Sequence, residues 1–160
     1  FMSKAIFFFF FDPITLGHID IVSRSAKQFV SLFVAVMVDD AVITSMSSND
    51  RVSSVKAACL NIANVEVVGF SGLLIDFARK NKVKTLVRSL RSADDFQYEY
   101  RMSVMNKSMS LDLETVFFMS SPEFGCISST LVRQILKCQG DAKAFVPEVL
   151  LAYLDQVKWR

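Results

Sequence analysis

Apolar runs and amphipathic stretches alternate along this chain. Runs of strand length without polar alternation are typical of strands that are buried on both faces of a sheet. They predict strands at residues 5–11, 32–38, 65–69, 85–88 and 115–119. The stretches between them carry apolar residues at helical spacing. The first predicted helix opens at Gly17 and buries Ile19, Val22, Ala26 and Phe29. Further helices are predicted at residues 50–63, with Asn49 as N-cap, and at 73–81, 93–109 and 131–138. A last helix is predicted to begin at Pro147.

This order of elements predicts an α/β fold. Strands that alternate with helices form right-handed crossovers, and hence a Rossmann-like, doubly wound parallel sheet, here with five strands. A chain of 160 residues is long enough for one substantial core, so we expect a single domain over residues 1–160. Within it, residues from about 134 to 160 form a helical C-terminal segment.

Composition narrows the range of partners. The net charge of +2 is too small to favour nucleic acid or an anionic membrane, and the first apolar run is too short to span a bilayer. The three cysteines are odd in number and lack metal-ligand spacing, which predicts a reduced, cytoplasmic protein. A hydrophobic content of 52% is compatible with apolar surface that other subunits cover.

The turn after the first strand has the features of an anion site. Asp12 and Pro13 end the apolar run, and Gly17 and His18 then open the first helix. The free N–H groups and positive dipole end of a helix attract phosphate, and glycine permits close approach. His18 is the single histidine of the chain and follows the carboxyl end of the first strand, where such sheets bind ligands. A structural and a catalytic role for His18 both remain open at this point.

Two further turns converge on the same edge of such a sheet. The fourth strand ends with Arg88 and is followed by Arg91, and the fifth helix opens with Ser128, Ser129 and Thr130. Arginine presents a charged fork that suits phosphate oxygens, and hydroxyl groups add donors to a helix start. Taken singly, the hydroxyl residues could be a helix cap and the arginines ordinary surface residues. Together with the histidine they favour a polyphosphate site, whose chemistry depends on positioning and charge neutralisation.

Four segments resemble bacterial phosphopantetheine adenylyltransferases: residues 11–18, 87–91, 95–99 and 127–133. The similarity extends from about residue 5 to residue 147 with little need for gaps. The Gly17-His18 pair alone is shared by a whole nucleotidyltransferase superfamily, whereas the four segments in this order are specific to the one family. The resemblance implies a homohexamer that transfers the adenylyl group of ATP, with Mg²⁺, to 4′-phosphopantetheine. It implies pyrophosphate and dephospho-coenzyme A as products, in the synthesis of coenzyme A.

The resemblance also implies roles for individual residues. His18 matches the residue that stabilises the transition state while the acceptor phosphate attacks the α-phosphorus directly. ATP contacts are implied for Phe11, His18, Ser89, Leu90, Arg91, Glu99, Phe124, Gly125, Cys126, Ile127, Ser128, Ser129 and Thr130. Acceptor contacts are implied for Leu74 and Arg88 and, along the pantetheine arm, for Tyr98, Met102 and Asn106. No protein side chain is implied as a metal ligand.

Four positions depart from the family where it contacts its substrates. Phe9 and Ser89 stand in place of glycines, and Phe10 stands in place of a hydroxyl residue. Val42 stands in place of a phosphate-binding lysine, whose loss removes roughly two to three decades of rate. Another basic residue could reach the phosphates instead. Two other functions therefore remain open: a nucleotide- or coenzyme A-binding oligomer with little or no turnover, and a related nucleotidyltransferase with another acceptor.

Overall fold

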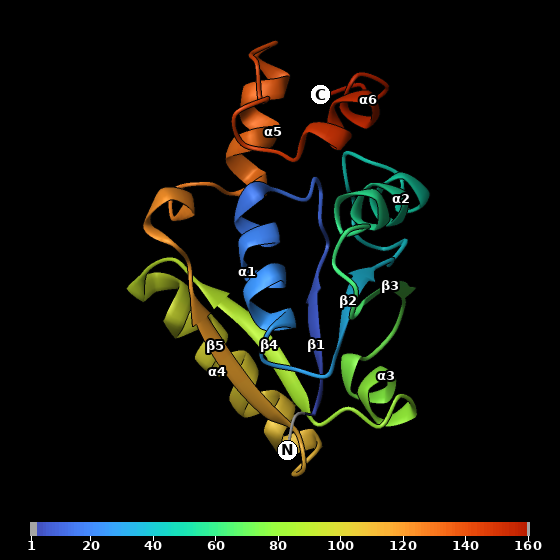
Figure 1. Cartoon of the computed structure of the whole chain (residues 1–160), viewed down its shortest axis with the longest axis vertical. Coiled ribbons are helices and arrows are strands. Elements are labelled where there is room, and N and C mark those ends of the chain that lie inside the picture. Colours follow the sequence, from blue (N-terminus) through green and yellow to red (C-terminus); the bar gives the residue numbers. More distant parts are fainter. Residues whose placement is uncertain (1–2, 160) are drawn as a thin grey trace.

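A parallel sheet of five strands, in the order β3-β2-β1-β4-β5, runs through the molecule. Its strands are β1 (Lys4–Phe9), β2 (Ser31–Met37), β3 (Val65–Phe70), β4 (Thr85–Leu90) and β5 (Glu114–Met119). Figure 1 shows this computed structural model, which describes residues 3–159. Every pair of neighbouring strands is parallel, and the winding direction reverses between β1 and β4. The predicted α/β fold with a doubly wound sheet is confirmed.

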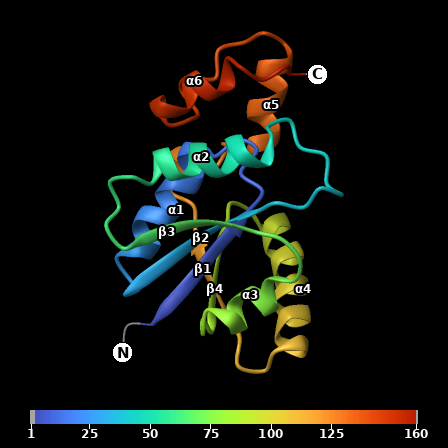
Figure 2. The same cartoon turned by 90° about the vertical axis from the view of Figure 1, so that its right-hand side faces the viewer.

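Helices cover both faces of the sheet (Figure 2). They are α1 (Leu16–Ala26), α2 (Ser48–Ala58), α3 (Leu74–Lys80), α4 (Ala93–Met109), α5 (Ser129–Lys137) and α6 (Leu151–Leu154), with two 3₁₀ helices, η1 (Pro122–Phe124) and η2 (Glu148–Leu150). In Figure 2, α1 and α2 lie on one face and α3 and α4 on the other, while α5 and α6 extend beyond the carboxyl end of β1. Among residues 3–159, no helix combines the length and the apolar character that crossing a membrane requires.

The central strand β1 is buried on both of its faces. Ala5 and Phe7 pack into a core with residues of α1, α2 and the C-terminal segment, whereas Ile6 and Phe8 pack into a second core with α3. Successive side chains of a strand point to opposite faces, so an unbroken apolar run supplies both cores at once. Full burial of one such phenylalanine stabilises the fold by about 1.5–3 kcal/mol. This burial fixes where the carboxyl end of β1 lies, and therefore where the following turn begins.

Several predicted boundaries around this turn are wrong. β1 ends at Phe9, two residues before the predicted end, because Phe11 takes a left-handed backbone conformation with a φ of 53° that a strand cannot contain. α1 begins at Leu16 with Thr15 as its N-cap and ends at Ala26, so Phe29 lies beyond the helix.

Elsewhere in the chain, local hydrogen bonds move other predicted boundaries. α2 has Ser47 as its N-cap in place of Asn49, because the Ser47 hydroxyl accepts a hydrogen bond from the Asp50 backbone N–H at 3.1 Å. That helix ends at Ala58, five residues before the predicted end. β4 ends at Leu90, two residues after the predicted end, because Ser89 still pairs with Phe118 of β5. After α5, as far as residue 159, the C-terminal segment is helical only in η2 and the short α6.

A buried arginine ties the ends of β1 and β2 to the start of α2. Arg51 is 1% exposed, and its Nη1 donates to the carbonyl oxygens of Phe10 and Met37, each at 2.7 Å. Its Nη2 donates to the Ser48 hydroxyl at 3.2 Å. Burial lowers the pKa of Arg51, and the nearby carboxylate of Asp12 partly offsets this effect. The guanidinium thus joins the turn after β1, through the Phe10 carbonyl, to the end of β2, through the Met37 carbonyl.

Arg51→Met should lower the free energy of unfolding by about 2–4 kcal/mol, because two buried carbonyl oxygens lose their donor. Urea unfolding followed by circular dichroism measures this change. Arg79→Met is the matched control, since Arg79 forms only an exposed ion pair with Asp76 at 3.4 Å. The control should change the free energy by less than about 0.5 kcal/mol. Equal effects of the two substitutions would contradict the role given to Arg51.

Candidate active site

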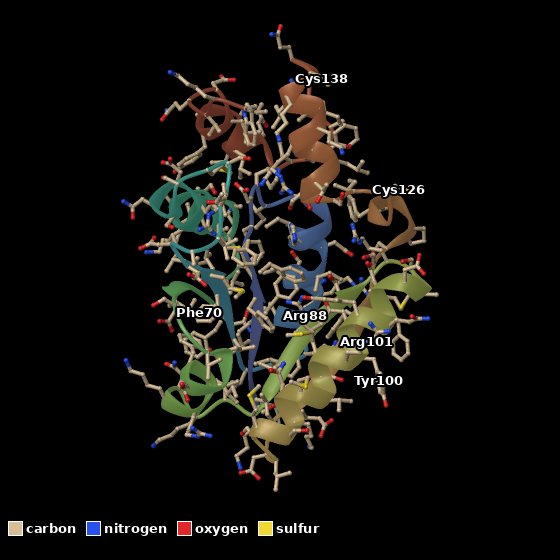
Figure 3. All side chains as sticks on the ribbon, turned by 180° about the vertical axis from the view of Figure 1, so that it is seen from behind. Phe70, Arg88, Tyr100, Arg101, Cys126 and Cys138 are labelled. Atoms are coloured by element: carbon tan, nitrogen blue, oxygen red, sulfur yellow. The ribbon has the colours of Figure 1, made fainter. Side chains whose placement is uncertain are left out.

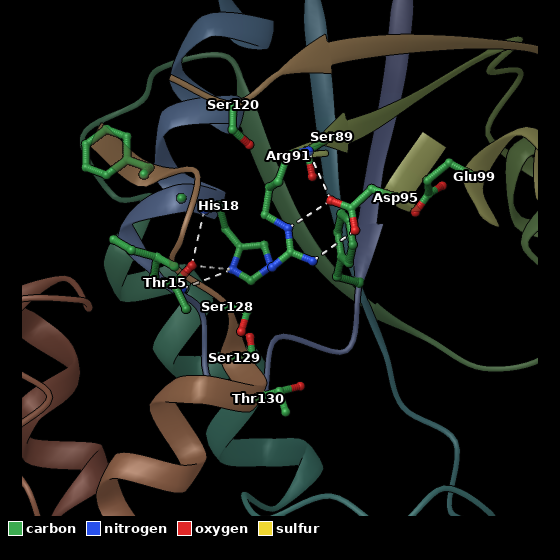
Figure 4. Close-up of a pocket in the computed structure, with 14 residues that line it drawn as sticks. Thr15, His18, Ser89, Arg91, Asp95, Glu99, Ser120, Ser128, Ser129 and Thr130 are labelled. Atoms are coloured by element: carbon green, nitrogen blue, oxygen red, sulfur yellow. Dashed lines mark hydrogen bonds and ion pairs between the residues drawn. The ribbon is translucent and has the colours of Figure 1, made fainter. Parts of the chain in front are cut away.

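Three strand-to-helix turns meet at the carboxyl edge of the sheet and enclose a pocket of about 200 Å³, here called the first pocket. It is lined by Phe9, Thr15, Gly17, His18, Ser89, Arg91, Asp95, Glu99, Ser120, Phe124, Ile127, Ser128, Ser129 and Thr130. Figure 4 shows these side chains converging from the start of α1, the end of β4, the start of α4 and the start of α5. The predicted convergence of the histidine, the second arginine and the hydroxyl residues is therefore observed.

The His18 ring is held by its own helix cap. The Thr15 backbone N–H donates to His18 Nδ1 at 3.0 Å, and the Thr15 hydroxyl also lies 3.0 Å from Nδ1. In return, the His18 backbone N–H donates to Thr15 Oγ1 at 3.4 Å, which completes a reciprocal capping box. Because Nδ1 accepts a backbone hydrogen bond, the neutral ring carries its proton on Nε2. His18 therefore offers an N–H donor on the ring edge opposite Thr15.

Burial beside two phenylalanine rings keeps His18 neutral. The ring centroids of Phe9 and Phe11 lie 5.3 and 5.1 Å from that of His18, and both contacts are edge-on. Burial lowers the pKa of His18 to about 3, and the positive charges of Arg91 and Arg88 contribute to the shift. The left-handed conformation of Phe11 turns its side chain into the core, where it is 1% exposed. At neutral pH the ring is thus a donor without a charge.

Arg91, the cation that lines the first pocket, is paired within its own turn. Arg91 Nε and Nη2 donate to the two carboxylate oxygens of Asp95 at 2.9 and 3.1 Å, and the Arg91 backbone N–H adds a third bond at 2.9 Å. Burial opposes ionisation of Asp95, but the hydrogen bonds and charge of Arg91 give that carboxyl a lowered pKa. The pair is partly exposed, so a phosphate can compete with the carboxylate for the Arg91 fork.

The hydroxyl residues at the start of α5 both cap the helix and face the first pocket. Ser128 is the N-cap, and its hydroxyl accepts from the Leu131 N–H at 3.1 Å. The Ser129 hydroxyl donates to the Pro13 carbonyl at 2.8 Å, which joins α5 to the turn after β1. The backbone N–H groups of Ser129 and Thr130 have no partner within the helix, as at any helix start. Capping and anion binding are thus compatible here.

Arg88 lies in a second pocket on the opposite face of β4. This pocket has a volume of about 400 Å³ and is lined by Phe8, Phe9, Phe10, Met37, Leu86, Arg88, Arg91, Asp95, Tyr98, Glu99, Met102, Ser103, Asn106 and Thr115. Arg88 Nε and Nη2 each donate to a carboxylate oxygen of Glu99 at 2.7 Å, and Nη1 donates to the Phe8 carbonyl. The Arg88 Cζ lies 3.8 Å from the centroid of the Phe9 ring. Every nitrogen of the Arg88 guanidinium is therefore already hydrogen-bonded.

Phe9 forms the boundary between the two pockets. Its ring lines both of them, and it contacts His18 on one side and the guanidinium of Arg88 on the other. Arg91, Asp95 and Glu99 also line both pockets. The Phe9 ring thus separates His18 from Arg88.

Some residues predicted from the sequence lie outside both pockets. Leu90 is buried in the sheet and Leu74 is buried at the start of α3. Gly125 and Cys126 lie in the turn before α5, and Phe11 packs behind His18 without lining a pocket. Phe10 and Val42 line a third cavity beside the first turn.

Other residues of the site were missed by the sequence reasoning. Thr15, Asp95 and Ser120 line the first pocket. Two of them had a readable signal, since Thr15 lies at the capping-box distance from His18 and Asp95 lies four residues after Arg91.

Comparison with known proteins places this chain in a family. Residues 8–135 match the family described as cytidylyltransferase-like. A phosphopantetheine adenylyltransferase from Clostridium perfringens (strain SM101 / Type A) is 39% identical over 146 residues, which cover 91% of this chain and 89% of that protein. One from Actinobacillus pleuropneumoniae serotype 7 is 42% identical over 91% of this chain and 92% of that protein. One from Caldanaerobacter subterraneus is 40% identical, with 93% of each chain covered.

A solved structure supports the fold independently. A Vibrio parahaemolyticus protein assigned as a nicotinate-nucleotide adenylyltransferase superposes with a TM-score of 0.69 at 17% identity, over 96% of this chain and 94% of that one. At that identity the likeness shows the fold alone. Since the family match spans most of the sequence and the relatives at 39–42% identity are covered almost end to end, the chain belongs to the phosphopantetheine adenylyltransferases within the cytidylyltransferase-like family.

Proposed function

We propose that this protein transfers the adenylyl group of ATP to the phosphate of 4′-phosphopantetheine, giving dephospho-coenzyme A and pyrophosphate in the synthesis of coenzyme A. The names of its relatives support this substrate pair. The observation that carries the proposal is the His18 ring, which is fixed by Thr15 and kept neutral beside the phosphate-binding start of α5. A fixed neutral donor suits the charge that develops on phosphate oxygens during an in-line displacement.

In this proposal the first pocket holds the nucleotide and the second holds the acceptor. The backbone N–H groups of Ser129 and Thr130 bind ATP phosphate oxygens, and Arg91 exchanges its bond to Asp95 for a bond to phosphate. His18 Nε2–H donates to the α-phosphate as the acceptor oxygen attacks and the bond to pyrophosphate breaks. The second pocket has an apolar lining that includes Phe8, Tyr98 and Met102, and this lining suits the pantetheine arm.

Magnesium enters this proposal as the counter-ion of ATP. Among residues 3–159, no group of three or more His, Cys, Asp or Glu side chains could hold a metal ion. Mg²⁺ commonly keeps several waters and binds through substrate phosphates, so a dedicated protein cage is not required. The ion would neutralise charge on the phosphates while the protein supplies His18 and Arg91 as fixed donors.

A homohexameric, cytoplasmic protein is part of the same proposal. The outer face of α4 and the following turn expose large apolar side chains, which is the kind of surface that subunit contacts cover. They are Phe96, Tyr100, Val104, Met105, Met109 and Leu111. Figure 3 shows Tyr100 extending outward from α4. Glu99, which pairs with Arg88 of β4, lies on α4, so self-association through this helix would support the second pocket.

One alternative function has a specific observation in its favour. Arg88 is fully hydrogen-bonded to Glu99 and Phe8 and is covered by the Phe9 ring, and Val42 supplies no charge. A protein in this state would bind a nucleotide or coenzyme A in an oligomer and turn over slowly or not at all. The two functions differ in one measurable quantity, the release of pyrophosphate.

Purified protein should release pyrophosphate from ATP and Mg²⁺ when 4′-phosphopantetheine is added, and nicotinate mononucleotide should not replace it. A coupled pyrophosphatase assay measures the rate. His18→Ala should lower kcat by about a thousandfold and leave the ATP Kd within about tenfold, because the donor acts in the transition state. His18→Gln, which keeps an N–H donor, should retain more activity. ATP binding without release would favour the alternative function, and near-normal turnover by His18→Ala would exclude the role of His18.

The His18 resonance should not titrate in the folded protein between pH 8 and about 5, because the pKa of the ring is lowered to about 3. Proton NMR follows this single histidine, and in urea it should titrate near the ordinary value of 6.5. Below about pH 6.5 the unfolded chain binds a proton that the folded chain does not. The His18 contribution to stability is therefore lost progressively as the pH falls from 6.5 toward 3. Titration of the folded protein near 6.5 would contradict the neutral donor.

Phe9→Ala should raise kcat/KM for 4′-phosphopantetheine by about tenfold, because the second pocket would then open toward His18. The ATP Kd should stay within about threefold, since the start of α5 is unchanged. Phe117→Ala is the control: this half-buried ring on β5 lines neither site pocket. Steady-state kinetics with both substrates, together with thermal unfolding of each variant, make the measurement. An unchanged or lower kcat/KM in a folded Phe9→Ala protein would show that the ring does not obstruct the acceptor.

A further inference from the structure

One side of the first pocket is formed by the segment 121–127, which connects β5 to α5. Phe124 and Ile127 of this segment line the pocket. The segment packs closely on the first turn of α1, since a Cβ atom added to Gly17 would lie 3.7 Å from the Phe124 carbonyl oxygen and 3.8 Å from that of Ile127. Its regular structure is limited to the three residues of η1. The position of the segment therefore depends on its contacts with other parts of the chain.

Among residues 3–159, one side chain accepts every hydrogen bond that joins the segment 121–127 to the rest of the chain. Asp20 Oδ2, on α1, accepts from the Ser121 hydroxyl at 3.0 Å and from the Ser121 backbone N–H at 3.3 Å. The other hydrogen bonds of the segment, such as that of the Ile127 N–H to the Phe124 carbonyl, are internal. Asp20 and His18 both belong to α1, so one helix carries the neutral donor and also holds the opposite part of the pocket.

Arg24 strengthens this connection one turn further along α1. Its Nη1 donates to Asp20 Oδ2 at 3.0 Å and to the carbonyl of Met119, the last residue of β5, at 2.7 Å. Its Cζ lies 5.8 Å from the centroid of the Phe118 ring. The Asp20 side chain is only 11% exposed, so solvent screens its charge less than that of a surface carboxylate. Because hydrogen bonds to an ionised carboxylate are stronger than neutral ones, the pair holds the end of β5 and the start of the segment together.

Under the proposed function, the segment 121–127 faces the base of the nucleotide. The ATP phosphates lie at the start of α5 with His18 at the α-phosphate, which leaves the side lined by Phe124 and Ile127 for the base. Apolar side chains cover the faces of a planar heterocycle, and backbone N–H and C=O groups of an irregular segment hydrogen-bond to its edge. A site of this kind rejects a base whose donors and acceptors do not match, provided that its own polar groups are held in place.

We propose that Asp20 and Arg24 are positioning residues that set the selectivity of this protein for adenine over other bases, because they hold the segment 121–127 in place. The inference rests on the proposed function for the identity of the nucleotide. A shift of this segment would weaken recognition of the base and leave the phosphate-binding start of α5 unchanged. The reason is that α5 is held separately, through the hydrogen bond from the Ser129 hydroxyl to the Pro13 carbonyl at 2.8 Å.

Titration calorimetry of the full chain with ATP, CTP and tripolyphosphate, each with Mg²⁺, tests this assignment without turnover. Asp20→Ala should raise the Kd of ATP by about tenfold, because the segment loses both of its outside hydrogen bonds. The ratio of the Kd of CTP to that of ATP should fall by about fivefold, whereas the Kd of tripolyphosphate, which has no base, should stay within about twofold. Asp76→Ala is the matched control, since it removes a carboxylate from an exposed ion pair on α3. It should leave all three Kd values within about twofold.

Three milder variants separate positioning from folding. Ser121→Ala removes only the 3.0 Å bond and should raise the Kd of ATP by about threefold. In the Asp20→Ala protein the same substitution should have no further effect, because the two side chains act through one contact. Arg24→Met should also raise the Kd of ATP by about threefold, with tripolyphosphate binding unchanged. Asp20→Asn keeps an oxygen that accepts from Ser121 and should recover most of the discrimination between ATP and CTP.

Other results would overturn the inference. Equal weakening of ATP and tripolyphosphate binding by Asp20→Ala would mean that the whole pocket is disturbed. An unchanged ratio of Kd values, additive effects of Asp20→Ala and Ser121→Ala, or equal affinity of the unsubstituted protein for ATP and CTP would also contradict it. Failure of the proposed function is distinguishable: pyrophosphate release would be absent while the differences in Kd among the variants persisted. Failure of the inference alone would leave turnover intact, with the same ratio of Kd values in every variant.

Discussion

The candidate site depends on the backbone carbonyl groups of residues 10–13, the turn that follows β1. The Phe10 carbonyl accepts from Arg51 of α2, the Asp12 carbonyl from Arg133 of α5, and the Pro13 carbonyl from Ser129. These groups have left the sheet ladder and would otherwise be unsatisfied. Their partners come from distant parts of the sequence, so the same bonds that satisfy the turn also bring α2 and α5 to it. The start of α1, with Thr15 and His18, is positioned as a consequence.

Near this turn two arginines are each paired with a carboxylate. Arg91 is bonded to Asp95, and Arg88 to Glu99. The first pair is partly exposed and can exchange its carboxylate for a phosphate at modest cost. The second is buried, and separating it would leave a carboxylate without a partner at low dielectric. The two arginines are therefore unequal: the Arg91–Asp95 pair is open to exchange and the Arg88–Glu99 pair resists it.

The sequence was sufficient for the fold because its signals were local and strong. The unbroken apolar run of β1 and the alternation of elements predicted the parallel sheet, and the motif order predicted the family. What the sequence could not supply was pairing across the chain. Nothing local indicates that Glu99 would hold Arg88, or that Asp12 would cap the backbone of Ser45 and Met46. The early end of β1 depends on the left-handed conformation of Phe11, which no apolar pattern encodes.

Phe9 links three properties of the site that are usually considered separately. Its ring contributes to the apolar surroundings that lower the pKa of His18, it covers the guanidinium of Arg88, and it separates the two pockets. A smaller side chain would admit water beside His18, over the Arg88 guanidinium and between the two pockets. The histidine would become easier to protonate, the Arg88–Glu99 pair easier to separate, and the acceptor path shorter. Changes at Phe9, His18 and Arg88 are therefore expected to be non-additive, because they act on one shared set of contacts. Any account of catalysis in this chain has to treat the Phe9 ring, the neutral His18 and the charged Arg88 as a single unit.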